Sequence, residues 1–143
     1  MINLATIMEA TKVLIQNNAN FSGYTIVRGE YINTDPSIDK WVGIYKAKVK
    51  YTPWVIGKGA RNWKAEVELK IVTQAFGIRG DLVDEELDTK ITNLLAAIET
   101  DRTLGGTVSM ITGYDISYEY ERNDDSTIPF QNAMISLLGE TRA

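Results

Sequence analysis

The strongest constraint on the fold is a nine-residue segment, 63–71, in which apolar and charged residues alternate without exception. Its apolar residues are Trp63, Ala65, Val67, Leu69 and Ile71, and its charged residues are Lys64, Glu66, Glu68 and Lys70. Side chains along a β-strand point alternately to its two faces. This segment therefore predicts a strand with one buried face and one solvated face.

A second alternating segment precedes it, at residues 41–51. We expect one of its faces to be apolar, formed by Trp41, Tyr45, Ala47, Val49 and Tyr51. The other face is expected to carry a stripe of lysines, Lys46, Lys48 and Lys50. Residues 52–62 contain Pro53, Gly57 and Gly59, which suit a connection between two strands. The two segments together predict an antiparallel hairpin.

Two other segments have the periodicity of amphipathic helices. In residues 2–16 the apolar stripe includes one polar residue, Thr11, and its other members are Leu4, Ile7, Met8, Leu14 and Ile15. A second helix is predicted to start at Asp81, a good N-cap residue that is followed by acidic residues favoured by the helix dipole. Its apolar stripe consists of Leu87, Ile91, Leu94, Leu95 and Ile98.

Three further segments, 24–29, 108–121 and 130–138, have β-strand patterns, and Gly139 is expected to end the last of them. In 108–121 the residues expected on one face are Val108, Met110, Thr112, Tyr114, Ile116, Tyr118 and Tyr120. The predicted order is α-β-β-β-α-β-β, within one domain of residues 1–143. Hairpins with helices inserted between them predict an α+β fold, in which helices pack on a mostly antiparallel sheet.

The composition excludes several kinds of site. The chain contains no Cys and no His, so disulfides, thiolate or imidazole metal sites, and Ser-His-Asp or Cys-His catalysis are excluded. A net charge of −4 and a pI near 4.9 argue against a protein that grips nucleic acid. No apolar run approaches the roughly 20 residues that a membrane span needs, so none is expected. No secretion signal is expected either, because Glu9 and Lys12 interrupt the N-terminal apolar stretch and no basic segment precedes it. No cofactor, metal or catalytic residue is predicted.

Four short motifs that could carry chemistry fit structural roles better. Ser37–Lys40 matches S-x-x-K, but it is predicted to lie in a loop and lacks the companion motifs of serine acyl enzymes. Gly57-Lys58-Gly59 lacks the spacing of a phosphate-binding loop. Glu119 and Glu121 would lie about 6.6–6.8 Å apart, as in an inverting glycosidase, but solvated strand faces often carry such pairs. Asp124-Asp125 fits a turn better than a metal site.

The distribution of charge is more informative than any motif. Residues 40–70 contain eight Lys and Arg against two Glu, a net charge of +6, whereas residues 81–125 contain twelve Asp and Glu against three Lys and Arg, a net charge of −9. The two regions could be separately solvated, or they could be neighbours within one monomer. Alternatively, they are opposite sides of a subunit that docks head to tail on its own copies and closes into a ring.

The residues predicted to form such contacts are Lys46, Lys48, Lys50, Trp54, Lys58, Arg61, Asp84, Glu85, Asp88, Glu119 and Glu121. Among them, Trp54 lies in the glycine-bearing connection. A tryptophan in such a place either tucks back under its own domain or anchors a partner.

Several segments also follow one another in a familiar order after the N-terminal amphipathic helix. They are Val27-Arg28-Gly29-Glu30, Trp41-Val42-Gly43-Ile44-Tyr45, Gly57-Lys58-Gly59-Ala60, residues 101–108 (DRTLGGTV) and residues 130–135 (FQNAMI). In pattern and order, over nearly the full length, the chain resembles the tail terminator (tail completion) proteins of long-tailed bacteriophages. The most specific part of the resemblance is the short turn at residues 104–108.

The resemblance implies a structural, non-enzymatic role. Members of this family are small α+β subunits that form a ring, expected to be a hexamer, on the end of the tail tube. The ring stops polymerisation of the tube and provides a surface for neck or head-completion proteins, while DNA passes through its lumen without being held. Such a protein would be found in the host cytoplasm during assembly and in the tail or neck of the virion.

Other functions stay open at this point. Within the same virion, the chain could be a neck (head-closure) subunit or a tail tube subunit. An enzyme that uses carboxylates or a lysine would need a deep pocket with a buried acid. A small-ligand binding module would need an apolar cavity between the sheet and the helices.

Overall fold

A computed structural model describes residues 2–29, 38–55, 61–76, 80–121 and 130–142. The element order is α1 (Leu4–Gln16), a 3-10 helix η1 (Ala19–Phe21), β1 (Thr25–Arg28), β2 (Trp41–Val55), β3 (Arg61–Phe76), α2 (Gly80–Glu99), β4 (Met110–Glu121) and β5 (Phe130–Arg142). The predicted α+β class and the predicted order of helices and strands are confirmed.

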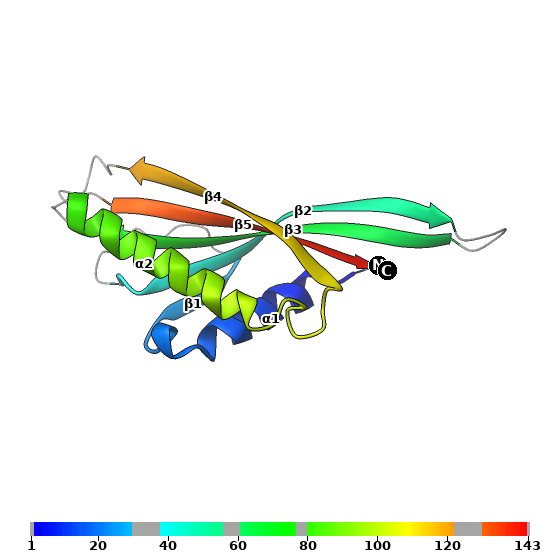
Figure 1. Cartoon of the computed structure of the whole chain (residues 1–143), viewed down its shortest axis with the longest axis horizontal. Coiled ribbons are helices and arrows are strands. Elements are labelled where there is room, and N and C mark those ends of the chain that lie inside the picture. Colours follow the sequence, from blue (N-terminus) through cyan, green and yellow to red (C-terminus); the bar gives the residue numbers. More distant parts are fainter. Residues whose placement is uncertain (1, 30–37, 56–60, 77–79, 122–129, 143) are drawn as a thin grey trace.

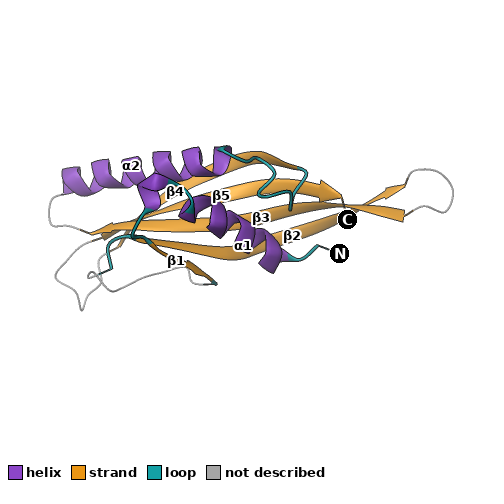
Figure 2. Ribbon diagram, turned by 90° about the horizontal axis from the view of Figure 1, so that it is seen from below, coloured by secondary structure: helices purple, strands orange, loops and turns teal. Residues whose placement is uncertain are grey.

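The strands form one sheet in the order β1-β2-β3-β5-β4. Strand β1 pairs with β2 in parallel, and the other neighbours are antiparallel. Both helices lie on the same face of the sheet (Figure 2). At one end, the β2–β3 hairpin projects beyond the body of the protein (Figure 1). Its last pairs, from Pro53–Trp63 to Val55–Arg61, lie beyond the end of the β3–β5 ladder.

The strand register divides the side chains between two faces, because directly paired residues lie on the same face and neighbours along a strand alternate. The helix face, on which α1 and α2 pack, receives alternate side chains of β3 from Ala65 to Ala75 and those of β5 from Ala133 to Thr141. The opposite face, here called the outer face, receives the charged residues of β3 that were predicted to be solvated, Lys64, Glu66, Glu68 and Lys70.

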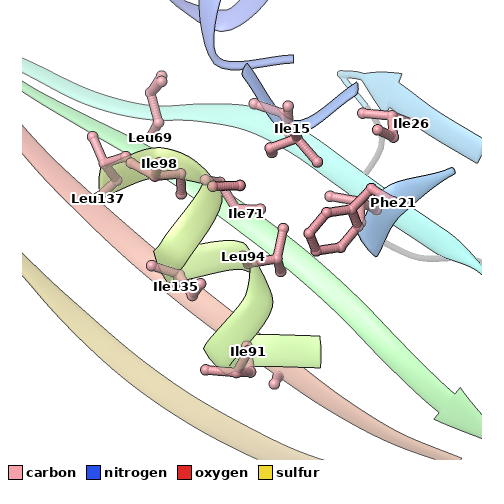
Figure 3. Close-up of a cluster of buried hydrophobic side chains, with 14 of the residues drawn as sticks. Ile15, Phe21, Ile26, Leu69, Ile71, Ile91, Leu94, Ile98, Ile135 and Leu137 are labelled. Atoms are coloured by element: carbon pink, nitrogen blue, oxygen red, sulfur yellow. The ribbon is translucent and has the colours of Figure 1, made fainter. Parts of the chain in front are cut away.

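The helix face holds the core, and every helix and strand contributes to it. From α1 come Ile7 and Ile15, and from α2 come Leu87, Leu94 and Ile98, all at most 2% exposed. Figure 3 shows several of these side chains converging with Ile71 of β3 and Ile135 of β5. The predicted apolar stripes of both helices are confirmed, although Leu4, Leu14 and Leu95 are only partly buried.

The polar residue in the stripe of α1 is accommodated by a local hydrogen bond. Thr11 is buried, and its hydroxyl donates to the carbonyl oxygen of Ile7 at 2.8 Å. At the start of the same helix, the side chain of Asn3 accepts from the backbone N–H of Ala5 at 3.0 Å, as an N-cap residue does.

The prediction that a single lysine stripe follows β2 is wrong. The register shifts between Lys46 and Lys48, so Ala47 is an extra residue opposite β3 and the alternation of faces reverses there. Before the bulge, Val42 and Ile44 lie in the core on the helix face, and Lys46 follows on that face. Beyond it, Lys48 and Lys50 lie on the outer face. As a consequence, Trp41 and Tyr45 also lie on the outer face, whereas Val49 and Tyr51 lie on the helix face.

Strand β4 contains a similar irregularity, with a register shift between Ile111 and Gly113. The predicted common face of residues 108–120 is therefore interrupted. Ile111, and not Met110, is buried on the helix face, whereas Met110 is 54% exposed. From Tyr114 onward the predicted alternation holds, with Ile116 and Tyr118 on the helix face and Asp115 and Glu119 on the outer face.

Several predicted boundaries also differ. Strand pairing continues through Thr52–Val55 and resumes at Arg61, well inside the predicted connection. Gly139 does not end β5, because residues 139–142 pair with residues 64–67 of β3. Helix α2 begins at Gly80, so Asp81 lies inside its first turn instead of at the N-cap. The turns predicted at 35–37 and 123–126 lie outside the described residues.

The turn after α2 is held by one carboxylate. Asp101 accepts hydrogen bonds from the backbone N–H groups of Thr103 and Gly105, both at 3.0 Å, and from the Thr103 hydroxyl at 2.6 Å. These bonds, led by that of the hydroxyl, lower the pKa of Asp101. They support three consecutive residues with positive φ, Leu104, Gly105 and Gly106. The turn thereby places Leu104 in the core and Gly105 beside Ala10 of α1.

Candidate functional site

The basic edge is the side of β2 that faces away from β3. Strand β1 covers only residues 41–44 of this edge, and no other described strand lies beside the rest of β2. Lys46, Lys48 and Lys50 are all exposed here. On the outer face, Lys48 is paired in register with Glu68 and Lys50 with Glu66, so the neighbouring strand partly compensates the charge of this edge.

The acidic edge lies on the other side of the sheet and consists of β4 and the adjacent part of α2. Strand β4 is the last strand of the sheet, and no described strand pairs with the edge that faces away from β5. On β4, Asp115 and Glu119 are exposed on the outer face. On α2, the predicted contact residues Asp84, Glu85 and Asp88 are all exposed.

Two tyrosines connect β4 to α2. The hydroxyl of Tyr114 donates to Glu99 at 2.5 Å, and partial burial together with this carboxylate raises the pKa of Tyr114 well above its ordinary value. The pKa of Tyr118 is also raised, first by partial burial and then by the charge of Asp88 and a hydrogen bond to it. Both hydroxyls are protonated at neutral pH, as ordinary tyrosines are, and can donate to these carboxylates.

The two edges do not neutralise each other within one subunit. Strands β3 and β5 separate β2 from β4. The ion pairs that the described residues form are Arg28–Glu9, Lys64–Glu66, Lys64–Glu140, Lys90–Glu86 and Arg102–Glu99. None of these joins the basic edge to the acidic edge. The two charged regions do touch where α2 packs against β3, but the described ion pairs do not join the lysines of β2 to the carboxylates of β4.

Four of the predicted contact residues are not placed as side chains. Trp54 and Arg61 lie in the hairpin strands, at the paired positions Trp54–Asn62 and Val55–Arg61, and Glu121 ends β4. Only the backbone of these three is described. Lys58 lies outside the described residues, as do Ser37, Gly57 and Asp124 of the motifs considered above. The role of Trp54 as an anchor stays a prediction.

Hollows on the surface of the described residues include a charged trough and an apolar groove. One, of about 380 Å³, is a trough on the outer face beside Lys48, Lys50, Glu66, Glu68 and Glu140. Its walls carry mixed charge from three strands, and its acids are exposed or half-buried, unlike a catalytic acid in an apolar pocket. The other, of about 530 Å³, is a shallow and mainly apolar groove between α1 and the turn at residues 105–107.

The described segments lack two further features, a cluster of metal-binding carboxylates and a membrane-spanning helix. These segments contain no group of three or more Asp and Glu side chains arranged to hold a metal ion. No helix among them is both long enough and apolar enough to span a membrane.

Sequence reasoning missed a buried lysine. Lys90 of α2 is only 5% exposed, and its ammonium group donates to the carbonyl oxygens of Gln74 at 2.8 Å and Asp39 at 2.9 Å. It also pairs with Glu86 at 3.2 Å and lies 5.8 Å from the centre of the Tyr24 ring. The signal was its position, one helical turn from both Leu87 and Leu94 and therefore close to the apolar stripe.

A pair of buried amides on the outer face was also missed. Gln74 and Asn132 are paired in register between β3 and β5 and are 0% and 7% exposed. Both side-chain polar atoms of Gln74, and the amide oxygen of Asn132, lack a hydrogen-bond partner among the described contacts. The outer face is therefore buried at the end that carries Gln74 and Asn132, and charged at the end near the hairpin.

The matches between this chain and known proteins come from solved structures. No family model matches the chain, and no curated protein is similar to it in sequence. A solved chain from the virion of a native gene transfer agent particle aligns over 96% of both chains, with a TM-score of 0.35 and 7% sequence identity. A likeness at this level assigns neither a family nor a function to the chain.

Proposed function

We propose that this protein is a non-enzymatic, ring-forming tail terminator of a long-tailed phage. In this role it caps the tail tube, stops tube polymerisation and provides the docking surface for the neck or head. The observation that carries the proposal is the placement of opposite charge on the two far edges of one sheet. The resemblance in sequence order to tail terminator proteins supports the same role.

Opposite charge at two different surfaces favours contacts between copies. A carboxylate edge attracts the lysine edge of another copy, and the two surfaces are not equivalent, so the contact is heterologous. Heterologous contacts generate a closed ring when the rotation between copies closes, and an open filament when it does not. A terminator requires the closed form, and we propose a hexamer.

The remaining partners follow from that role. The proposed partners are the tail tube protein on one side of the ring and a neck or head-completion protein on the other. DNA would pass through the lumen without specific binding, as the resemblance implies, and the net charge of −4 does not favour a grip on phosphate. The protein would lie in the tail or neck of the virion and in the host cytoplasm during assembly.

The test is the oligomeric state of the purified chain and its effect on tubes. Mass photometry and sedimentation, with and without tube protein of the same virion, should detect a closed ring of fixed mass. Electron microscopy should show tubes of reduced length that carry a ring at one end. A chain that stays monomeric at high concentration, even with tube protein, would contradict the proposal.

The same experiment separates the neighbouring roles. A tail tube subunit would polymerise into open stacks on its own, and its addition would lengthen tubes. A neck subunit would bind finished tails without changing the length of growing tubes. Only a terminator both binds the growing end and stops elongation.

A further inference from the structure

Each edge of the sheet presents an unpaired strand of considerable length. Strand β4 has twelve residues, and no described strand pairs with its free edge, which faces away from β5. At the opposite edge of the sheet, the part of β2 beyond the bulge pairs with no described strand except β3. Such edges expose rows of backbone N–H and C=O groups that can pair with a strand of another chain.

The side chains of the two edges are complementary face by face. On the outer face, β2 presents Lys48 and Lys50, and β4 presents Asp115 and Glu119. On the helix face, β2 presents Val49 and Tyr51, while β4 presents Tyr114, Ile116 and Tyr118. Ile116 and Tyr118 are 39% and 54% exposed, which is unusual for apolar side chains on the covered face.

The charges also disfavour the wrong pairings. If two β2 edges paired, lysine would face lysine, and if two β4 edges paired, carboxylate would face carboxylate. Like charges directly opposite each other destabilise a sheet. Only the pairing of β2 with β4 brings opposite charges together, and this pairing is the heterologous one.

The directions of the strands suit a closed assembly. Strand β4 runs antiparallel to β2 within the sheet, since three antiparallel steps separate them. A rotation about an axis along the strands keeps these directions. The β4 strand of one copy would therefore be antiparallel to the β2 strand of the next copy.

More than one register pairs a lysine of β2 with a carboxylate of β4 on the outer face and Val49 with an apolar or aromatic residue on the helix face, so the tilt of the strands decides between them. Placing Lys50 opposite Asp115 places Val49 opposite Ile116 and Tyr51 opposite Tyr114. Within one subunit, a row of paired residues crosses the sheet from Lys50 of β2 to Met110 of β4, by way of Glu66 of β3 and Glu140 of β5. Met110 pairs with Glu140 of β5, whereas Asp115 pairs with Ser136, four residues away. Pairing Lys50 with Asp115 of the next copy therefore shifts that copy by four residues, or about 14 Å, along the strands. Each copy adds four strand spacings, or about 19 Å, so the strands would tilt by about 35°, which is within the range of closed sheets.

We propose that β4 of one copy pairs with β2 of the next, with Gly113–Ser117 opposite Lys48–Thr52, so that the sheet continues from subunit to subunit. This inference rests on the proposed ring and specifies the contact that forms it. Lys46 lies on the other face of β2 and is not a partner of Asp115 or Glu119.

The first test is complementation between two charge-reversed variants. The basic edge is reversed in Lys48→Glu/Lys50→Glu, and the acidic edge in Asp115→Lys/Glu119→Lys. Each variant alone should self-associate about 100-fold more weakly than the wild type, because its two edges now carry like charge. An equimolar mixture should restore assembly, with the two variants alternating around an even-numbered ring.

A matched control changes the same net charge elsewhere on the protein. Lys12→Glu/Lys40→Glu also replaces two lysines by glutamates, but neither lies on β2. This variant should assemble like the wild type. Either reversed variant assembling normally alone, or a folded mixture that stays monomeric, would overturn the proposed strand pairing.

The second test covers variants that fail to fold. The natural chain has no cysteine, so introduced thiols report one contact. Mixed Lys50→Cys and Asp115→Cys proteins should form a disulfide-linked dimer under mild oxidation, whereas Lys46→Cys with Asp115→Cys should not. Equal cross-linking of both pairs would overturn the proposal.

The outcomes distinguish this inference from the proposed function. If wild-type rings form but the reversed variants assemble equally well, the strand pairing is wrong and the ring remains. If the wild type never assembles, alone or on tubes, both are wrong.

Discussion

The two faces of the sheet are built from alternating residues of the same strands, yet their contents differ. The helix face of β3 and β5 is almost entirely aliphatic and is sealed by α1 and α2. The outer face carries Lys48, Lys50, Glu66, Glu68 and Glu140 near the hairpin and two buried amides at its other end. The difference indicates that the helix face supplies stability, while the charged part of the outer face is available for contacts.

The largest expected effect compares one leucine on each face. Leu94 of α2 is fully buried on the helix face, so Leu94→Ala should lower the free energy of unfolding by about 2–5 kcal/mol. Leu138 lies on the outer face and is only partly buried, so Leu138→Ala should cost about 1 kcal/mol. Urea denaturation at low protein concentration measures both without a contribution from self-association.

Equal losses in the two variants would contradict this comparison. They would mean that, in the free protein in solution, the outer face around Leu138 is packed as tightly as the core beneath α2.

The contrast between the faces was largely predictable, because Trp63–Ile71 alternates without interruption and both helices have clear apolar stripes. The reversal of faces along β2 was not. A bulge depends on how the partner strand is paired, and Ala47 carries no local signal for one. The lysine stripe therefore looked continuous in sequence, whereas Lys46 and Lys48 point to opposite faces.

The candidate site was predicted in outline only. The sum of charges along the chain identified a basic region and an acidic region, and the sheet order places them on separate edges. That order could not be deduced from the sequence, because β5 inserts between β3 and β4 through long-range pairing. Buried polar residues such as Lys90 and Gln74 depend on contacts between distant elements and were missed for the same reason.

The next effect tests the buried end of the outer face. Gln74 is 0% exposed and both of its amide atoms lack a partner among the described contacts. Replacing a buried, unsatisfied amide by an apolar side chain of similar shape removes its desolvation cost. Gln74→Met should therefore raise the free energy of unfolding by about 1–2 kcal/mol. Denaturation curves measure this gain, and a loss of stability would instead show that the amide is hydrogen-bonded in solution.

A smaller effect concerns the turn that joins α2 to β4 beside α1. Asp101→Asn replaces an acceptor by an amide nitrogen, which cannot accept from both Thr103 and Gly105, so the melting temperature at pH 7 should fall. Because the pKa of Asp101 is lowered in the folded state, its contribution is full above the unfolded value of about 3.9. It is lost as the pH falls through the folded value.

The difference in melting temperature between Asp101→Asn and the wild type should accordingly shrink as the pH is lowered from 5 to below about 3. Thermal melts of both proteins across this range check the prediction. A difference that stays constant with pH would mean that the carboxylate charge does not stabilise the turn.

The smallest effect is expected for the ion pairs of the outer face. Lys64 lies 3.3 Å from Glu140 and 3.9 Å from Glu66, and all three side chains are at least one-third exposed. Solvent screens such pairs, so Glu140→Gln should change the free energy of unfolding by only about 0–0.5 kcal/mol, and Lys64 retains Glu66 as a partner. A double-mutant cycle with Lys64→Met, repeated in 1 M NaCl, measures the coupling, which salt should abolish. A coupling above about 1 kcal/mol that survives salt would place these charges in a desolvated environment. The charged half of the outer face would then contribute to folding as the helix face does, and it would no longer be a surface reserved for contacts with other subunits.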